Sequence, residues 1–88
     1  MFVFHSDPGH GWLEVPMGDL EELGIDGEIT PYSYRNGDTA YLEEDCDAGT
    51  FFRAYKDRHG KPPEFVEEYR GESPVRSYPH YYQTQKGV

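Results

Sequence analysis

The pair Asn36-Gly37 constrains the fold of this chain more than any other feature of its sequence. It lies between two segments rich in Tyr and Thr, and an Asn-Gly pair favours the mirror-image turn that closes a two-residue β-hairpin. We therefore predict an antiparallel hairpin with Asn36 and Gly37 at its tip. In that register two pairs of side chains share one face, namely Tyr34 with Thr39 and Tyr32 with Tyr41. Ala40 and Leu42 line the other face, beside Ser33.

The segment DCDAGTFFRAYKDRHGKPP follows the hairpin and predicts a helix over Asp47–His59. Its apolar residues recur at the spacing of one helix face, which gives a single buried stripe of Ala48, Phe51, Phe52 and Tyr55. Either Asp45 or Asp47 is expected to cap the free N–H groups of the first turn. Gly60 and the following Pro62-Pro63 pair are expected to end the helix.

Weaker patterns fill the rest of the chain. Phe2–His5 and Gly11–Pro16 read as two strands joined by the turn-forming SDPGHG segment. A short helix is predicted over Met17–Leu23, and residues 64–71 read as a strand, with a helix as the alternative. Prolines interrupt residues 73–82, which we expect to be irregular or a late edge strand.

These elements predict one α+β domain over residues 1–82. An antiparallel sheet of about four strands would pack on one face against the Asp47–His59 helix, with the short Met17–Leu23 helix alongside. The aromatic content of 16% makes a small core feasible in a chain of 88 residues. Residues 83–88 are predicted to form a flexible tail.

Charge narrows the possible partners of the protein. Seventeen acidic and eight basic residues give a net charge of −9, which would be repelled by nucleic-acid phosphates and by anionic membranes. We expect no direct binding to either, and basic surfaces, cations or apolar patches remain as partners. Solubility explains the charge equally well. The single Cys, the absence of a signal-peptide pattern and the lack of a long apolar run favour a cytoplasmic protein.

The acidic residues fall into clusters along the chain. If these clusters shared one face, they would form a negative strip that could imitate nucleic-acid phosphates and dock on a basic groove. The tyrosines would add the amphipathic contacts that interfaces favour. The alternative is an ordinary acidic surface. The candidate partner-binding residues are Glu21, Glu22, Glu43, Glu44, Asp45 and Asp47.

Other kinds of site have weaker support. His5, Asp7 and His10 could offer three ligands to zinc or another transition metal, although their spacing matches no metal motif. Cys46 could act as a nucleophile at a helix N-terminus, but the neighbouring carboxylates disfavour its thiolate. No phosphate-binding loop, dinucleotide fingerprint or nucleophile elbow is present. We therefore expect no catalytic residue and no cofactor. A structural protein that pairs with itself through its tyrosine face is a third alternative.

Three segments resemble a group of small uncharacterised acidic proteins encoded by bacteriophages and other mobile elements. They are DPGHGWLEVP, LEELGI and YSYRNGDTAYLEEDCDAGTFF, and together they span roughly residues 5–52. The resemblance implies a bacterial host cell as the setting. It carries no known activity and therefore no functional residue. In that setting we expect a non-enzymatic protein that binds a basic surface of a host protein, as a nucleic-acid mimic or an inhibitor of host defence.

Overall fold

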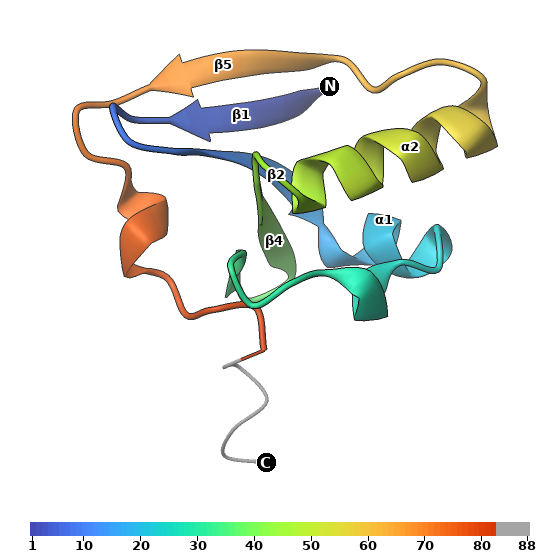
Figure 1. The fold of residues 1–88 in the computed structure, drawn as a ribbon, viewed down its shortest axis with the longest axis horizontal. Coiled ribbons are helices and arrows are strands. Elements are labelled where there is room, and N and C mark those ends of the chain that lie inside the picture. Colours follow the sequence, from blue (N-terminus) through green and yellow to red (C-terminus); the bar gives the residue numbers. More distant parts are fainter. Residues whose placement is uncertain (83–88) are drawn as a thin grey trace.

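The computed structural model describes residues 1–82 as a five-stranded sheet with helices (Figure 1). The strands are β1 (Phe2–Ser6), β2 (Gly11–Pro16), β3 (Tyr34–Asn36), β4 (Thr39–Glu43) and β5 (Phe65–Tyr69), in the order β3-β4-β2-β1-β5. The α-helices are α1 (Met17–Glu22) and α2 (Asp47–His59), and the 3₁₀ helices are η1 (Asp26–Glu28) and η2 (Pro74–Ser77). The predicted tail, residues 83–88, lies outside the described residues.

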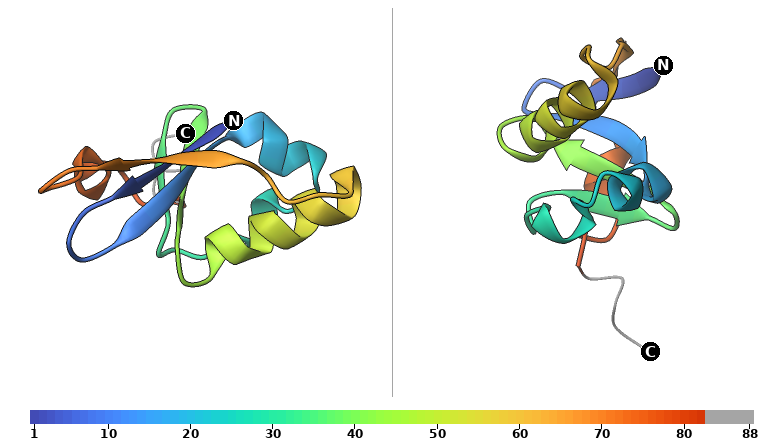
Figure 2. Two further views of the ribbon diagram at one scale, coloured as in Figure 1. Left: turned by 90° about the horizontal axis from the view of Figure 1, so that it is seen from above. Right: turned by 90° about the vertical axis from the view of Figure 1, so that its right-hand side faces the viewer.

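The predicted single α+β domain is confirmed, but its sheet is mixed and has one strand more than expected. β1 pairs antiparallel with β2 and parallel with β5, in a register that sets Phe2 against Phe65 and Ser6 against Tyr69. The parallel pair arises because α2 and the loop after it carry the chain back to the outer side of β1 before β5 begins (Figures 1 and 2). The paired residues of β1 and β5 are more than sixty positions apart, so no local sequence pattern indicates whether these strands run parallel or antiparallel.

The β3–β4 hairpin forms, but its turn lies one residue later than predicted. Asn36 pairs with Thr39, so that Gly37 and Asp38 are the central turn residues and Tyr34 pairs with Tyr41. Gly37 has a φ of 63°, and no non-glycine residue among 1–82 has a positive φ. Positive φ at the first central position alone is the pattern of a type II′ turn rather than the type I′ turn that Asn-Gly favours. The pairing moves by two positions, so the residues of β3 and β4 stay on their predicted faces. Tyr32 and Ser33 lie before β3, so the predicted pair of Tyr32 with Tyr41 does not form.

The main core lies between the sheet and α2. The predicted bounds of α2 are confirmed, and its apolar stripe packs on β2 and β4. Phe51 is fully buried, and its ring meets the ring of Phe2 edge-on at 5.3 Å between centroids. Burial of this apolar surface supplies most of the driving force for folding. The buried members of the cluster are Leu13, Val15, Met17, Leu20, Ile25, Ile29, Ala40, Leu42, Ala48, Phe51 and Tyr81.

The C-terminal segment 73–81 covers the other face of the sheet, where no layer was predicted. Val75 in η2 is 1% exposed and packs in a second cluster with Trp12 and Tyr41. Figure 1 and the left view of Figure 2 show this segment, in orange to red, apart from α2 with strands between them. It joins β3 only through a single bridge between Tyr34 and His80. The expected late edge strand is therefore reduced to one pair of residues.

The second glycine of the GHGW motif, Gly11, is required for steric reasons. A Cβ atom at this position would lie 2.3 Å from a ring carbon of Phe4, which is too close for any side chain. The ring of Phe4 therefore lies directly over the backbone at the start of β2. A glycine here allows the β1–β2 hairpin to pack closely.

Candidate functional site

The two predicted acidic clusters lie at opposite ends of α2. Arg58, in the last turn, donates a hydrogen bond from Nη2 to the backbone oxygen of Glu22 at 3.2 Å. Glu43 and Asp45 lie at the first turn of the same helix. The rise between Asp47 and Arg58 is about 17 Å at about 1.5 Å per residue. Glu21 and Glu22 therefore lie at the far end of the helix from Glu43–Asp47, and the two clusters do not form one continuous patch.

Asp47 is a structural residue rather than a surface one, which corrects its assignment to a partner-binding face. It is 1% exposed, and its carboxylate accepts hydrogen bonds from the N–H and hydroxyl of Thr30, the latter at 2.7 Å. The hydroxyl of Ser33 donates to the same carboxylate. A buried carboxylate is stable only when its oxygens are paired in this way. Asp47 thus ties the start of α2 to the loop before β3.

Glu43, not Asp45 or Asp47, caps α2. Its carboxylate accepts hydrogen bonds from the N–H groups of Asp45 at 3.0 Å, of Cys46, and of Asp47 at 3.2 Å. Free N–H groups and the positive end of the helix dipole both favour a carboxylate there. The predicted cap was wrong because the chain turns sharply between β4 and α2. This turn brings the last residue of the strand over the first turn of the helix.

Glu44 and Asp45 are exposed, while Glu43 is half-buried. We call Glu43, Glu44 and Asp45 the acidic corner. The pKa of the neighbouring Cys46 thiol is raised. The charge of Glu43 is the main cause, burial comes next, and Asp47 and Asp45 contribute further. The thiol is therefore a poorer nucleophile at neutral pH than an ordinary cysteine, as the sequence predicted.

Asp7 is occupied within the protein and is not available as a metal ligand. Its side chain is 2% exposed and accepts hydrogen bonds from Nε and Nη2 of Arg76 at 2.6 and 2.9 Å. Three backbone N–H groups, of Gly9, His10 and Ser73, donate to the same carboxylate at 3.0 to 3.2 Å. The Arg76 guanidinium is the main reason that the pKa of Asp7 lies well below its usual value. Asp7 thereby fastens the C-terminal segment to the loop between β1 and β2.

His5 and His10 also contact other groups of the protein instead of converging on a metal site. Nε2 of His5 lies 2.7 Å from Oε1 of Glu14, and the ring of His10 lies against Trp12 with 6.0 Å between centroids. Within residues 1–82, no group of three or more His, Cys, Asp or Glu side chains is placed to hold a metal ion. The predicted set of His5, Asp7 and His10 therefore does not form a metal site.

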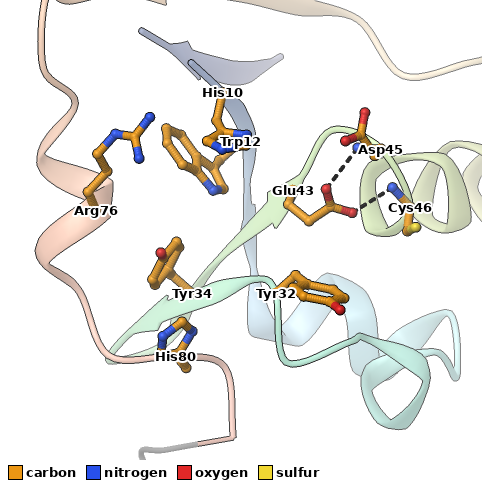
Figure 3. Close-up of a pocket in the computed structure, with 9 residues that line it drawn as sticks. All are labelled: His10, Trp12, Tyr32, Tyr34, Glu43, Asp45, Cys46, Arg76 and His80. Atoms are coloured by element: carbon orange, nitrogen blue, oxygen red, sulfur yellow. Dashed lines mark hydrogen bonds between the residues drawn. The ribbon is translucent and has the colours of Figure 1, made fainter. Parts of the chain in front are cut away.

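A pocket of about 380 Å³ opens beside the acidic corner (Figure 3). It lies on the face of the sheet that the C-terminal segment covers. Sequence reasoning missed it because its walls come from segments far apart in the chain. The lone Trp and the tyrosines that alternate in the hairpin were the available signals. The lining residues are His10, Trp12, Tyr32, Tyr34, Glu43, Asp45, Cys46, Arg76 and His80.

Aromatic rings form most of the pocket wall. Tyr34 meets Trp12 edge-on, with centroids 6.1 Å apart, and stacks on His80 at 4.8 Å. Tyr32 is 73% exposed, and its ring pairs with no other ring in the described part of the chain. Trp12 is nearly buried, so it supplies the floor, whereas Tyr32 forms an open rim.

The basic group of the pocket is paired within residues 1–82, whereas its acidic groups have no basic partner there. Arg76 is its one lysine or arginine, and the bond to Asp7 neutralises that charge. Glu43 and Asp45 on the opposite side have no ion pair with Lys or Arg in residues 1–82. Figure 3 shows this division, with Arg76 beside Trp12 on one side and with Glu43 and Asp45 on the other, next to the start of α2. Aromatic faces next to unpaired carboxylates attract cations.

Comparisons with protein-family models, curated proteins and solved structures found no match to this chain. The site is therefore interpreted from its own geometry. Among residues 1–82, no helix is both long enough and apolar enough to cross a membrane.

Proposed function

We propose that this protein is a non-enzymatic binding protein of phage or mobile-element origin that docks on a basic surface of a host protein. The docking residues are Glu44 and Asp45 of the acidic corner, with Glu43 adding its charge. In this proposal the host surface is one that normally meets nucleic-acid phosphates, and the acidic corner takes their place.

One observation carries this proposal, namely that the acidic corner adjoins an aromatic pocket. Glu43 and Asp45 belong to both. Acidic surfaces alone are common, but exposed carboxylates next to tryptophan and tyrosine combine the charge and the contact area of a binding interface. The net charge of −9 would speed encounter with a basic partner and would make the association sensitive to salt.

The alternative functions have less support. The metal hypothesis loses Asp7, which Arg76 and three backbone N–H groups occupy. A nucleophilic role for Cys46 is opposed by the raised pKa of its thiol. Self-association through the tyrosine face is opposed by burial, since Tyr41 is 8% exposed beneath the C-terminal segment.

The test is affinity capture from bacterial host lysate, followed by binding measurements with the purified partner. The variant E44K/D45K reverses the exposed charges and retains Glu43, because Glu43 caps α2. The matched control is E21K/E22K, which makes the same charge change at the far end of α2. We expect one basic partner that is captured at low salt, released at high salt and lost with E44K/D45K alone.

Circular dichroism must show that both variants are folded. Equal loss of the partner with both variants would indicate attraction by total charge and would contradict a defined docking face. Retention of the partner by E44K/D45K would reject the acidic corner as that face. Capture that persists at high salt would argue against an electrostatic interface.

A further inference from the structure

Strand β5 forms one edge of the sheet and is the most exposed strand among residues 1–82. It lies outermost in the sheet, next to β1, and all five of its residues are exposed. Figure 1 and the left view of Figure 2 show no other element of residues 1–82 beyond it. The C-terminal segment does not cover this edge, because its bridge joins it to β3 at the opposite edge. β5 therefore presents an uncovered strand edge.

The pairing with β1 determines which backbone groups of β5 point outwards. At one end, the N–H of Phe2 donates to the backbone oxygen of Glu64 at 2.9 Å. At the other end, the N–H of Arg70 donates to the backbone oxygen of Ser6, also at 2.9 Å. In a parallel pair, alternate residues of a strand bond to the same neighbour, so the even-numbered residues from 64 to 70 bond to β1. The residues whose N–H and C=O groups point away from β1 are Phe65, Glu67 and Tyr69.

These three residues also place their side chains on one face, because alternate residues of a strand point to the same side. It is the face that α2 covers, since the rings of Phe65 and Phe52 lie 5.9 Å apart between centroids. The carboxylate of Glu67 accepts the hydroxyl of Ser6 at 2.6 Å. Phe65 is 45% exposed and Tyr69 is 63% exposed. The edge thus presents an acidic group between two open aromatic rings.

A second copy of the chain is a poor occupant of this edge. If two β5 strands paired antiparallel through all three outward residues, the Glu67 side chains of the two copies would lie opposite one another. Like charges in that position are destabilising, and the net charge of −9 adds a general repulsion between copies. Charged side chains on an edge strand commonly prevent self-pairing in this way. A basic strand would turn the same charge into attraction.

We propose that β5 binds an extended basic segment of a protein partner, which adds to the sheet as an antiparallel strand. Its backbone pairs with the outward N–H and C=O groups of β5. A Lys or Arg of the segment lies opposite Glu67, and apolar residues lie opposite Phe65 and Tyr69. This inference goes beyond the proposed function, because β2 and β1 separate β5 from β4 and the acidic corner.

The test uses the peptide acetyl-Thr-Val-Thr-Lys-Thr-Val-Thr-amide, which places Val, Lys and Val on one face of a strand. It is titrated into ¹⁵N-labelled protein and followed by NMR. We expect the backbone amide signals of Phe65, Glu67 and Tyr69 to shift saturably and their exchange with solvent to slow. The indole N–H of Trp12 lies in the pocket and should not shift.

Two altered peptides separate strand pairing from attraction by charge. The first carries N-methyl groups on both Val residues, which removes two donors to β5 but keeps the side chains and the charge. The second carries Glu in place of Lys, which keeps the backbone donors but reverses the charge opposite Glu67. We expect neither peptide to produce a saturable shift at β5.

Two neighbouring substitutions in the protein test the side-chain contact. E67Q and E68Q remove the same charge, but Glu68 points to the other face of β5, where it lies 3.3 Å from Arg70. The Gln of E67Q can still accept the hydroxyl of Ser6. We expect E67Q to weaken peptide binding about threefold, as for a cross-strand ion pair, and E68Q to leave it nearly unchanged. Circular dichroism checks the fold of both variants.

The outcomes distinguish this inference from its alternatives and from the proposed function. Equal binding of the N-methylated peptide, equal weakening by E67Q and E68Q, or unshifted amides in β5 would each overturn strand addition. Protection of the same amides that rises with protein concentration alone would assign the edge to a second copy. The variant E44K/D45K should bind the peptide as the wild type does. The acidic corner and the β5 edge can therefore fail separately.

Discussion

The two faces of the sheet are covered by different kinds of interaction. Against α2, a continuous apolar cluster around Leu13, Leu42 and Phe51 excludes water. On the other face, a small cluster of Trp12, Tyr41 and Val75 lies under a segment with little regular structure. Polar bonds from Asp7 to residues 73 and 76 hold that segment. The first face is stabilised by burial, whereas on the second face the Asp7 carboxylate fastens the start of the segment and backbone hydrogen bonds to Ser33 and Arg35 fasten its end.

The functional consequence is that the second face shapes the candidate site. Arg76 and His80 both line the pocket and both belong to the C-terminal segment. If the part of that segment around Arg76 detached, the pocket would lose one wall, whereas Tyr81 at the end of the segment belongs to the main core cluster. Substitutions on the two faces should therefore separate overall stability from the integrity of the site.

The largest expected effect is that of Phe51→Ala on the α2 face. Removing a fully buried phenyl ring leaves a cavity and should reduce the free energy of unfolding by about 3–5 kcal/mol. Small domains have about 5–15 kcal/mol in total, so the variant should be close to unfolding. Urea denaturation followed by circular dichroism measures the change. A loss below about 1 kcal/mol would contradict the central place of Phe51 in the core.

The second prediction concerns Asp7→Asn, which removes the charge that holds the C-terminal segment. Because the folded pKa of Asp7 lies well below its usual value of about 3.9, its carboxylate stabilises the fold above about pH 4. That contribution is lost as the pH falls towards the folded pKa. Wild type should therefore exceed D7N in stability at pH 7, and the difference should shrink between about pH 5 and pH 2.

Urea unfolding of both proteins across this pH range is the measurement. Trp12 fluorescence should also differ between them near neutral pH, because Arg76 lies over that ring only while Asp7 holds it. Parallel stability curves from pH 7 to pH 2 would contradict the assignment of this acid sensitivity to Asp7.

The smallest of the three effects is expected for Val75→Ala. Val75 is buried but belongs to a cluster of only three buried residues, so loss of its two methyl groups should cost about 1–2 kcal/mol. The variant should keep the circular dichroism signal of α2 while the Trp12 fluorescence changes. A cost equal to that of F51A would mean that the two faces fold as one core and would contradict their separate stabilisation.

Elements with local signals could be predicted from the amino-acid order alone. The spacing of Ala48, Phe51 and Tyr55 predicted α2 with its observed bounds, because helical periodicity lies in adjacent residues. The opening hairpin was also read correctly, except that β1 ends one residue later than predicted, whereas the parallel pairing of β1 with β5 was not foreseen. The Asn36-Gly37 signal found the second hairpin but misplaced its turn by one residue, since the register depends on pairing along the whole of β4 with its neighbours.

The roles of the acidic residues, in contrast, follow from the three-dimensional fold. Asp7, Glu43 and Asp47 look alike in the sequence, yet one fastens the C-terminal segment, one caps α2 and one is buried beneath the loop before β3. Their roles depend on donors contributed by Arg76, by backbone N–H groups and by Thr30. The charge of a carboxylate is a property of its residue type, but its availability is set by which donors the fold brings to it. Asp45 lies at the edge of the pocket and forms no ion pair with Lys or Arg within residues 1–82.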